Sequence, residues 1–415
     1  MRILTFATVA ASLTLNVSGF IADPRQVRWN TLTGKQTQLV GHRGEKAFMP
    51  EHTRASYWQA AVEGADYIEP DLGLSKDGHL IVNHNEWLSE NTNVASIPEL
   101  AHLRTNKTWT NDGKPTTVDD WFVMDLTLAQ IKMLRVKQAP FAWRPQHFNG
   151  MFEVLTFEEY LQIVRNVTID LGRPFGVIPE LKSPLLYNLG RSYPRYFEDR
   201  AILTLQHYGW TTVTGKIDES QHSDLSFAPL RPLNGSCLGP AAWQSFDQET
   251  AAYLSSHTST PVVALNQNLP WFFTPKGLDR VATYAQIVSP WKDFFVTGAE
   301  AYFKSQNITW DAKEIAQLGG FIAPDRLAKE IHKRGMTLSP YTFYDSHQAM
   351  SYLCQSGVKP LSKSGFCPKD KREEFFYFFE QGMDFMFVEN IQEANVLRIL
   401  YTNHLEQQRA SEYSS

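Results

Sequence analysis

The chain is predicted to be an α/β protein folded as a parallel (β/α)8 barrel, and three observations point to this class. Short apolar runs of strand character alternate with helix-like segments along most of the sequence, which is typical of a parallel sheet with crossover helices. Polar residues suited to catalysis follow several of the strand-like runs directly, as they do at the rim of such a barrel. At 415 residues, 43% of them hydrophobic, the chain is long enough for one barrel with insertions.

We place the barrel domain at residues 38–404. Nine strands are candidates for it: Gln38–Val40, Tyr67–Leu72, Leu80–Val82, Phe175–Lys182, Ala242–Phe246, Val262–Leu265, Gln286–Ser289, Met336–Phe343 and Phe385–Val388. A barrel of this kind needs eight strands, so one candidate lies outside it, and Gln286–Ser289 is the one that we would leave out. The irregular stretch 88–150, after the third strand, is predicted to be an insertion that folds over the strand ends.

The predicted helices lie between the strands. Thr53–Gly64 carries apolar residues at helical spacing and ends at a glycine, and Phe157–Val167 begins after Thr156 with Glu159 at the capping-box position. Further helices are predicted at Leu126–Val136, Phe197–His207, Leu278–Ala285, Pro324–Arg334, Glu373–Gln381 and Gln392–His404. The stretch Trp291–Trp310 is expected to form a second, smaller insertion, and 405–415 a polar, flexible tail.

Residues 1–19 have the pattern of a secretory signal peptide. Met1-Arg2 supplies a positive start, Ile3–Leu15 is an apolar run, and small residues precede the predicted cleavage site after Gly19, with Ala22 as a second choice. A membrane anchor is the alternative, but polar residues interrupt the run, and no later stretch is long and apolar enough to span a membrane. We therefore expect an exported protein, secreted or, in a Gram-negative host, periplasmic.

Composition narrows the partners and the covalent chemistry. A formal charge of −5 leaves no basic footprint, which argues against a nucleic-acid partner. Of the three cysteines, Cys354 and Cys367 would close a short loop and are the pair that we favour for a disulfide. In an exported protein of a eukaryotic host, four Asn-x-Ser/Thr sequences are potential glycosylation sites: Asn106, Asn166, Asn234 and Asn307.

The residues that suggest a function begin at the end of the first strand. Gly41-His42-Arg43-Gly44 places a histidine and an arginine between two glycines, which allow an anion to come close. In the next strand Glu69 and Asp71 share one face, where two carboxylates repel each other unless a cation lies between them. Two solvated acids on an edge strand are the alternative, but the apolar neighbours favour a buried face and a hard divalent cation.

Two later strands add to this set. His84 follows Leu80–Val82, and Glu180 and Lys182 share a face at the end of Phe175–Lys182. A lone loop histidine and a Glu-Lys ion pair are the simpler interpretations of each feature alone. In a parallel barrel, however, all strand ends meet at one rim, so the seven residues are expected to converge.

The residue types define a chemistry. Three carboxylates, Glu69, Asp71 and Glu180, suit a divalent cation such as Ca²⁺ or Mg²⁺. Two cationic side chains, those of Arg43 and Lys182, suit the remaining oxygens of a phosphate. Two histidines, His42 and His84, can divide the general base and general acid roles. The set is suited to phosphodiester cleavage.

These motifs resemble the motif series of glycerophosphodiester phosphodiesterases, in order from about Gln38 to Asn390 and closest to the exported, periplasmic-type branch. The matching segments are His42-Arg43-Gly44, Pro50-Glu51-His52-Thr53, Gly64–Leu72, Val82-Asn83-His84, Pro179–Lys182, Gln244–Asp247 and Tyr341–Phe343. The resemblance implies a TIM-type barrel with a family insertion, and one divalent cation, Ca²⁺ favoured and Mg²⁺ as the alternative, on Glu69, Asp71 and Glu180. It also implies His42 and His84 as the catalytic pair and hydrolysis of a small glycerophosphodiester to sn-glycerol 3-phosphate and an alcohol.

The chain departs from the family pattern at two positions. Asn85 stands where the family commonly has Asp after the second histidine, from which we expect weaker activity or a shifted pH optimum. Val388-Glu389-Asn390 replaces the usual end of the last strand, so no role is assigned to Glu389. Two other functions stay open: a phospholipase D-like enzyme that acts on lysolipids or sphingomyelin, and a non-catalytic surface-binding protein on the same fold.

Overall fold

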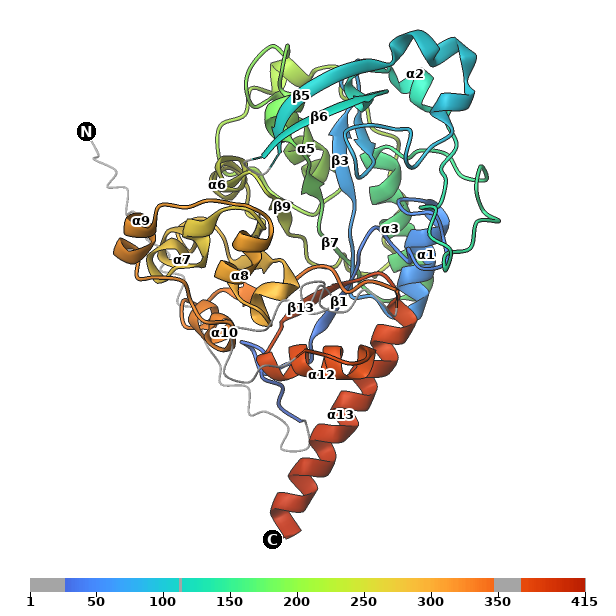
Figure 1. Ribbon diagram of the computed structural model, residues 1–415. Helices are drawn as coiled ribbons and strands as arrows, with labels where there is room; N and C mark the ends of the chain where they lie inside the picture. Colours follow the sequence, from blue (N-terminus) through green and yellow to red (C-terminus); the bar gives the residue numbers. More distant parts are fainter. Residues whose placement is uncertain (1–26, 112–113, 347–366, 415) are drawn as a thin grey trace, which may run out of the picture.

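The computed structural model describes residues 27–111, 114–346 and 367–414 (Figure 1). Within them, eight parallel strand positions succeed one another around a barrel. The strands are β1 (Gln38–Gly41), β2 (Tyr67–Ile68) with β3 (Asp71–Leu74), β7 (Gly176–Val177) with β8 (Glu180–Leu181), β9 (Trp243–Ser245), β10 (Val262–Asn266), β11 (Ile287–Pro290), β12 (Thr337–Leu338) and β13 (Phe385–Val388).

Two hydrogen-bonded sheets share these strands. One has the order β13-β1-β2-β7 and the other β12-β11-β10-β9-β8-β3-β4. The sheets are continuous because β2 runs on into β3 and β7 into β8, each after a two-residue break. At the other edge, Phe343 pairs with Val388 in parallel, and Phe343 N donates to Phe387 O over 2.8 Å. The predicted parallel eight-stranded barrel is confirmed.

The strand that lies outside the parallel ring is not the one that the sequence suggested. Ile287–Pro290 pairs in parallel with both β10 and β12 and belongs to the barrel. Instead β4 (Leu80–Val82) runs antiparallel to β3, with Leu72 opposite Val82 and Leu74 opposite Leu80. The turn Lys76-Asp77-Gly78 is too short for a crossover, so it closes a hairpin and returns the chain along β3. Our choice of Gln286–Ser289 was wrong for this reason.

Helices surround the strands (Figure 1). The α-helices are α1 (Arg54–Glu63), α2 (Leu128–Ile131), α3 (Phe157–Leu171), α4 (Pro184–Tyr187), α5 (Tyr196–His207), α6 (Gln248–His257), α7 (Pro275–Val281), α8 (Ala299–Ser305), α9 (Ala312–Gln317), α10 (Pro324–His332), α12 (Lys371–Gln381) and α13 (Ile391–Ser414). The short 3-10 helices are η1 (Val94–Ser96), η2 (Pro98–Leu103), η3 (Val123–Asp125), η4 (Glu219–His222), η5 (Pro270–Phe273) and η6 (Lys292–Phe295). The predicted capping box at Thr156 and Glu159 opens α3.

The barrel interior explains where the site residues point. One buried apolar cluster takes a single residue from each of seven strand positions: Val40, Tyr67, Ile178, Ala242, Val263, Ile287 and Phe387. Because side chains alternate between the two faces of a strand, the residue two positions further along points inward again. Those next inward positions include His42, Glu69, Glu180, Gln244 and Glu389. The apolar layer is thus followed by a polar one.

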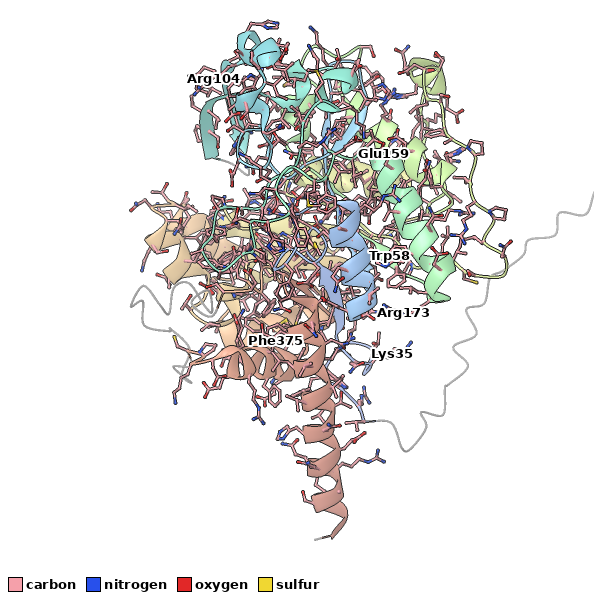
Figure 2. The ribbon with its side chains drawn as sticks, turned by 90° about the vertical axis from the view of Figure 1, so that its right-hand side faces the viewer. Lys35, Trp58, Arg104, Glu159, Arg173 and Phe375 are labelled. Carbon is pink, nitrogen blue, oxygen red and sulfur yellow. The ribbon has the colours of Figure 1, made fainter. Side chains whose placement is uncertain are left out.

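The segment 88–150 packs over one end of the barrel. It contains η1, η2 and a hairpin of β5 (Thr105–Asn111) and β6 (Lys114–Asp120), whose strands are antiparallel. Figure 2 shows Arg104, beside this hairpin, at the end of the molecule opposite to helix α13. Trp109 and Phe122 of the segment pack with Leu186, a residue of helix α4, which follows β8.

Several predictions concern the ends and the surface. Residues 1–19 and Cys354 lie outside the described residues; Cys367 is disulfide-bonded, and Cys237 is a free, exposed thiol. The tail expected at 405–415 is helical up to Ser414, because α13 continues beyond the barrel. Asn106, Asn234 and Asn307 are exposed, whereas Asn166 is half-buried on α3. In the described part of the chain no helix combines the length and hydropathy that crossing a bilayer requires.

Candidate active site

The loop after β1 adopts an unusual backbone conformation. Arg43 has a φ angle of 62° and Gly44 one of 89°, both in the left-handed region. A Cβ atom at Gly44 would collide with the side chain of Ser56, so this position requires glycine. The turn is tied to the next strand because the backbone N–H of Arg43 donates to Glu69 Oε2 over 2.8 Å. It directs the side chains of His42 and Arg43 into a cavity at the barrel rim.

Three buried carboxylates meet at the ends of neighbouring strands. Pro70 interrupts the strand between Glu69 and Asp71, and Asp71 pairs in register with Glu180. One oxygen of each carboxylate lies within 4.8 Å of the others, and the residues are 1%, 1% and 7% exposed. Oxygen donors of this charge at this spacing fit a hard divalent cation, which would relieve their mutual repulsion.

The electrostatics of the cluster disfavour negative charge on all three carboxylates at once. Burial, together with the charges of Asp71 and Glu180, raises the pKa of Glu69 well above its usual range. Burial also raises the pKa of Glu180 to about 8, although Lys182 acts in the opposite direction. Burial alone would raise the pKa of Asp71 as well, but the surrounding imidazoles and cations hold it well below its usual range. One carboxylate therefore keeps its charge while its neighbours are driven to hold protons.

Two cationic side chains border this cluster. Arg43 Nη1 donates to both oxygens of Glu51 over 3.2 and 3.1 Å, and Arg43 Nε lies 3.3 Å from Asp71 Oδ2. Lys182 Nζ lies 3.0 Å from Glu180 Oε1. Burial would lower the pKa of Arg43 and of Lys182, but the adjacent carboxylates outweigh it and raise both. Both side chains thus remain charged in a buried place, where they suit an anionic ligand.

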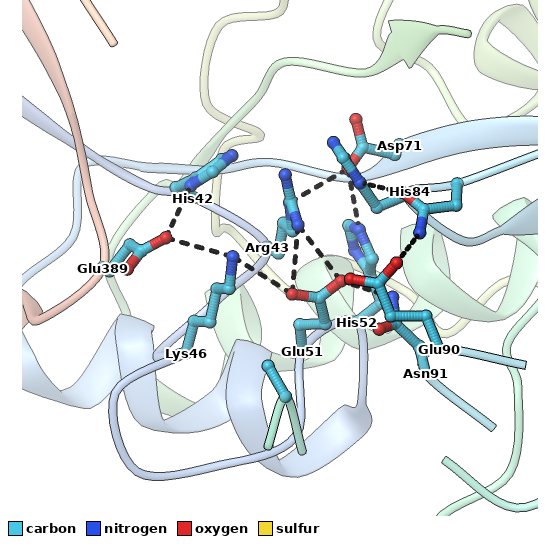
Figure 3. Close-up of polar contacts among 12 residues, drawn as sticks. His42, Arg43, Lys46, Glu51, His52, Asp71, His84, Glu90, Asn91 and Glu389 are labelled. Carbon is cyan, nitrogen blue, oxygen red and sulfur yellow. Dashed lines mark hydrogen bonds and ion pairs between the residues drawn. The ribbon is translucent and has the colours of Figure 1, made fainter. Parts of the chain in front are cut away.

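The ring of His84 contacts the side chain of Asn85, which in turn is hydrogen-bonded to Glu90 (Figure 3). Its Nδ1 lies 2.6 Å from Asn85 Oδ1, and Asn85 Nδ2 donates to Glu90 Oε2 over 2.7 Å. Burial and the nearby charges of Arg43 and Lys182 lower the pKa of His84 well below its usual value. The imidazole is therefore neutral at physiological pH, as a general base must be before it acts.

His42 belongs to a separate ionic network that includes Glu389 (Figure 3). His42 Nδ1 lies 3.5 Å from Glu389 Oε1, and the same oxygen lies 3.0 Å from Lys46 Nζ. The other oxygen of Glu389 accepts from Arg144 Nη2 over 2.6 Å, while Arg144 also binds Asp345 through two nitrogens at 2.9 Å. Burial, reinforced by the charge of Arg43, lowers the pKa of His42 to about 3.

A third histidine, His52, completes the support of the acidic cluster. Its Nε2 lies 2.9 Å from Asp71 Oδ2, and its Nδ1 lies 2.8 Å from the hydroxyl of Tyr57. Glu51, next to it, accepts from Asn91 Nδ2 over 2.8 Å and from Lys46 over 3.2 Å. His52 has a φ angle of 58°, which brings its ring back toward β3.

All seven residues predicted from the sequence converge at this rim, but several of their partners were not singled out. Glu51 and His52 lie in Pro50-Glu51-His52-Thr53, so the motif contained that signal. Lys46 and Arg144 carry no signal that sets them apart from solvated surface cations, and Glu389 was given no role. Arg144 comes from the segment 88–150, more than 200 residues before its partner Asp345, and no local pattern links the two.

The residues surround connected cavities. One, of about 390 Å³, is lined by six of the seven predicted residues, with Phe246, Trp291 and Tyr341 among its apolar walls. A neighbouring cavity of about 670 Å³ shares Arg43 and His84 with it and opens toward Phe141 and Trp143. These two rings stack at 4.7 Å and are about half exposed. The charged centre thus has room for a small ligand whose two ends occupy the two cavities.

Fold and site together define a barrel enzyme with buried cationic side chains and an acidic cluster that could hold a metal ion. Residues 42–362 match the glycerophosphoryl diester phosphodiesterase family, and the chain belongs to this family of phosphodiester hydrolases.

Three comparisons illustrate the relationship. The chain is 29% identical to glycerophosphodiester phosphodiesterase GDPD6 of Arabidopsis thaliana, over 74% of this chain and 75% of the relative. It is 25% identical to a glycerophosphodiester phosphodiesterase of Haemophilus influenzae, over 72% of this chain and 81% of the relative. A crystal structure of a protein from Silicibacter pomeroyi, described as a glycerophosphoryl diester phosphodiesterase, superimposes with a TM-score of 0.53 at 14% identity, over 90% of this chain and 98% of that one. This last likeness bears on the fold alone.

Proposed function

We propose that the chain is a metal-dependent phosphodiesterase that hydrolyses glycerophosphodiesters to sn-glycerol 3-phosphate and an alcohol. The observation that carries this proposal is the acidic cluster of Glu69, Asp71 and Glu180, with ligand atoms within 4.8 Å of one another beside two buried cations and two neutral imidazoles. Family membership supports the same activity.

Each group has a role that its surroundings allow. Arg43 and Lys182 bind the phosphate oxygens, Arg43 through Nη2, which has no hydrogen-bond partner among the described residues. His42 and His84 both line the cavity and share the acid and base roles. An anionic phosphate beside them opposes the effect of Arg43 and Lys182 on their pKa values, so substrate binding favours proton uptake by an imidazole.

Glu69, Asp71 and Glu180 are the residues that would hold the cation, and we favour Ca²⁺, with Mg²⁺ as the alternative. When bound, such an ion polarises phosphoryl oxygens and offsets the charge that develops in the transition state. The protein itself keeps the three carboxylates in place: Gln244 Nε2 donates to Glu69 Oε1 over 3.1 Å, and His52 holds Asp71.

The two other functions left open by the sequence are not favoured. A non-catalytic binding protein would have no use for the full set of carboxylates, imidazoles and cations that this site retains. A phospholipase D-like activity finds no support in the family match or in the relatives, which carry glycerophosphodiesterase names.

The proposal is tested by incubating purified protein with glycerophosphocholine and measuring glycerol 3-phosphate in a coupled assay. We expect turnover that a chelator abolishes and that added Ca²⁺ or Mg²⁺ restores. Glu69→Gln and Glu180→Gln should remove it, while Glu99→Gln on the exposed surface should not. Product formation that persists after exhaustive chelation would refute the metal dependence. Release of choline from lysophosphatidylcholine, with no turnover of glycerophosphocholine, would refute the substrate class.

Export is proposed on the first 19 residues of the sequence, with potential glycosylation at the exposed Asn106, Asn234 and Asn307. Expression of the full chain in a eukaryotic host should release protein into the medium with its N-terminus at residue 20 or 23. Mass spectrometry of the N-terminal peptide decides the cleavage, and mass spectrometry of the peptides that carry Asn106, Asn234 and Asn307, before and after glycosidase treatment, decides the glycosylation. Retention of the intact N-terminus inside the cell would contradict export.

A further inference from the structure

Asn85 stands where the resemblance leads us to expect Asp beside the second histidine, and in the structure a third residue, Glu90, is hydrogen-bonded to it. Asn85 is 8% exposed and lies between His84 and Glu90. Asn83 Nδ2 donates to the backbone oxygens of Asn85 and Trp87 over 2.7 and 3.2 Å, and the N–H of Asn83 donates to Asp71 O over 3.0 Å. The segment that carries His84 is therefore fixed to the rim of the barrel.

The chemistry of the three side chains dictates the direction of both hydrogen bonds. An ionised carboxylate can only accept, so the atom of Asn85 that faces Glu90 must be its NH₂ group. The amide oxygen then faces His84 Nδ1 at 2.6 Å, and an oxygen can only accept from that nitrogen. The proton of the neutral imidazole is thus on Nδ1, and Nε2 keeps its lone pair.

An amide alone does not enforce this arrangement. With Asp in this position the side chain accepts from Nδ1–H whichever way it is turned, whereas Asn can present either its oxygen or its NH₂. If the NH₂ faced Nδ1, the proton would move to Nε2. Nε2 would then have no lone pair free to accept a proton from the substrate. A second group must therefore determine which way the amide points.

We propose that Glu90 is a positioning residue, which holds His84 in its Nδ1–H form through Asn85. The pair Asn85 and Glu90 together replaces the single carboxylate that the family commonly places beside this histidine. The proposal rests on the function proposed above, in which His84 exchanges a proton with the substrate. Glu90 lines the cavity beside His84, and its carboxylate lies on the far side of Asn85 from the imidazole.

The first test is spectroscopic and does not depend on activity. In protein labelled with ¹⁵N-histidine, the His84 signals are assigned by their loss in His84→Ala. We expect the wild type to show a protonated Nδ1 and a bare Nε2, and Glu90→Leu to show a mixture or the reverse. Glu90 is exposed, so the substitution should fold, and Glu99→Leu serves as an exposed control that leaves the signals in place.

The second test is a double-mutant cycle in the glycerophosphocholine assay. Glu90→Leu should lower kcat by about tenfold with little change in KM, a part of what general base catalysis contributes. Asn85→Asp alone should also lower kcat, because it places a carboxylate against Glu90, the residue that it meets at 2.7 Å. The double variant Asn85→Asp, Glu90→Leu should recover to within about threefold of the wild type, because Asp then holds Nδ1–H directly.

The outcomes separate the inference from the function on which it rests. An inactive wild type with the expected tautomer would refute the proposed function and support the role of Glu90. An active wild type whose tautomer and kcat are unchanged in Glu90→Leu would overturn the role of Glu90 and leave the function intact. A double variant no better than the worse of its single variants would also overturn it, because Asp would then not substitute for the pair.

Discussion

At the scale of single residues, His42 and His84 have different surroundings but the same predicted importance for turnover. His42 lies beside the ionic network of Glu389, and His84 beside the Asn85 amide, yet burial and nearby cations lower the pKa of both. Each ring is therefore neutral and ready to exchange a proton with a ligand in the shared cavity. In the proposed function the two share one reaction, and within the described part of the chain no third histidine lines this cavity.

We expect His42→Ala and His84→Ala each to lower kcat by about 10² to 10⁴, the usual contribution of general acid–base catalysis. Steady-state kinetics on glycerophosphocholine measure the loss, and the exposed His102→Ala controls for removal of a histidine as such. Near-normal turnover in either catalytic variant would remove that residue from the mechanism.

Glu389 supports a residue-scale prediction of its own. It is fully buried, and burial would raise its pKa, but Lys46, His42 and Arg144 outweigh this and keep it ionised. Replacing one member of a buried ion network leaves the opposite charges unpaired, at a cost of about 3 to 5 kcal/mol. Glu389→Gln keeps the shape of the side chain and removes only its charge.

We therefore expect Glu389→Gln to lower the free energy of unfolding by about 3 kcal/mol and to reduce kcat as His42 loses its neighbour. Urea unfolding and the activity assay measure the two effects, with the exposed Glu380→Gln as the matched control. A variant as stable and as active as the control would show that Lys46 and Arg144 find other partners.

At the scale of elements, the loop after β1 is joined to helix α13 through a buried acid. Glu45 is fully buried, and its Oε2 accepts from the backbone N–H of Ile391 over 2.7 Å, at the first residue of α13. Burial, with Glu63 as its neighbour at the end of α1, raises the pKa of Glu45 from 4.5 to about 10. The native state therefore keeps a proton that the unfolded chain releases above pH 4.5.

Because of this difference in proton binding, the stabilisation that Glu45 provides decreases as the pH rises. Its contribution to stability is fully present below pH 4.5 and is lost progressively up to about pH 10, by at most about 1.4 kcal/mol per pH unit. Glu45→Gln removes the titration but can keep the hydrogen bond from Ile391. We expect the variant to gain stability over the wild type from pH 5 to pH 9 in urea unfolding. A difference that stays constant with pH, as expected for the exposed Glu406→Gln, would contradict the shifted pKa.

At the same scale, the strands and loops show which features of the site can be predicted from the sequence. Alternation within strands was enough to predict that Glu69, Glu180 and His42 reach one rim, because each lies two positions after an inward apolar residue. Strand direction was not predictable in this way, since β4 has the same apolar pattern as a barrel strand and only its short turn distinguishes it. The contacts of Lys46 and Arg144 depend on loop conformation and on residues distant in sequence, for which a local pattern holds no information.

At the scale of the whole molecule, the barrel brings three carboxylates together, and the rest of the fold must offset their mutual repulsion. In the acidic cluster Glu69 comes from the break between β2 and β3, Asp71 from the start of β3 and Glu180 from the start of β8, so these strands can only pair if the repulsion between the carboxylates is offset. Arg43, Lys182 and His52 offset part of it. A cation that binds the folded cluster, but finds no such cluster in the unfolded chain, would stabilise the whole barrel.

We therefore expect divalent cations to raise the melting temperature. Binding to the native state alone stabilises by about 2.7 kcal/mol when the free ion is present at 100 times its Kd. For a domain of this size that corresponds to a few degrees in Tm. Thermal unfolding in chelator, Ca²⁺ and Mg²⁺ measures the shift, and the ion with the larger shift at equal concentration is the one that the cluster prefers. Glu69→Gln and Glu180→Gln should each reduce the shift, while Glu99→Gln should keep it, because Glu99 lies on the exposed surface. If both ions left Tm unchanged at millimolar concentration, Glu69 and Glu180 would be holding protons rather than sharing a metal with Asp71, and the role of the cluster would have to be sought in proton transfer.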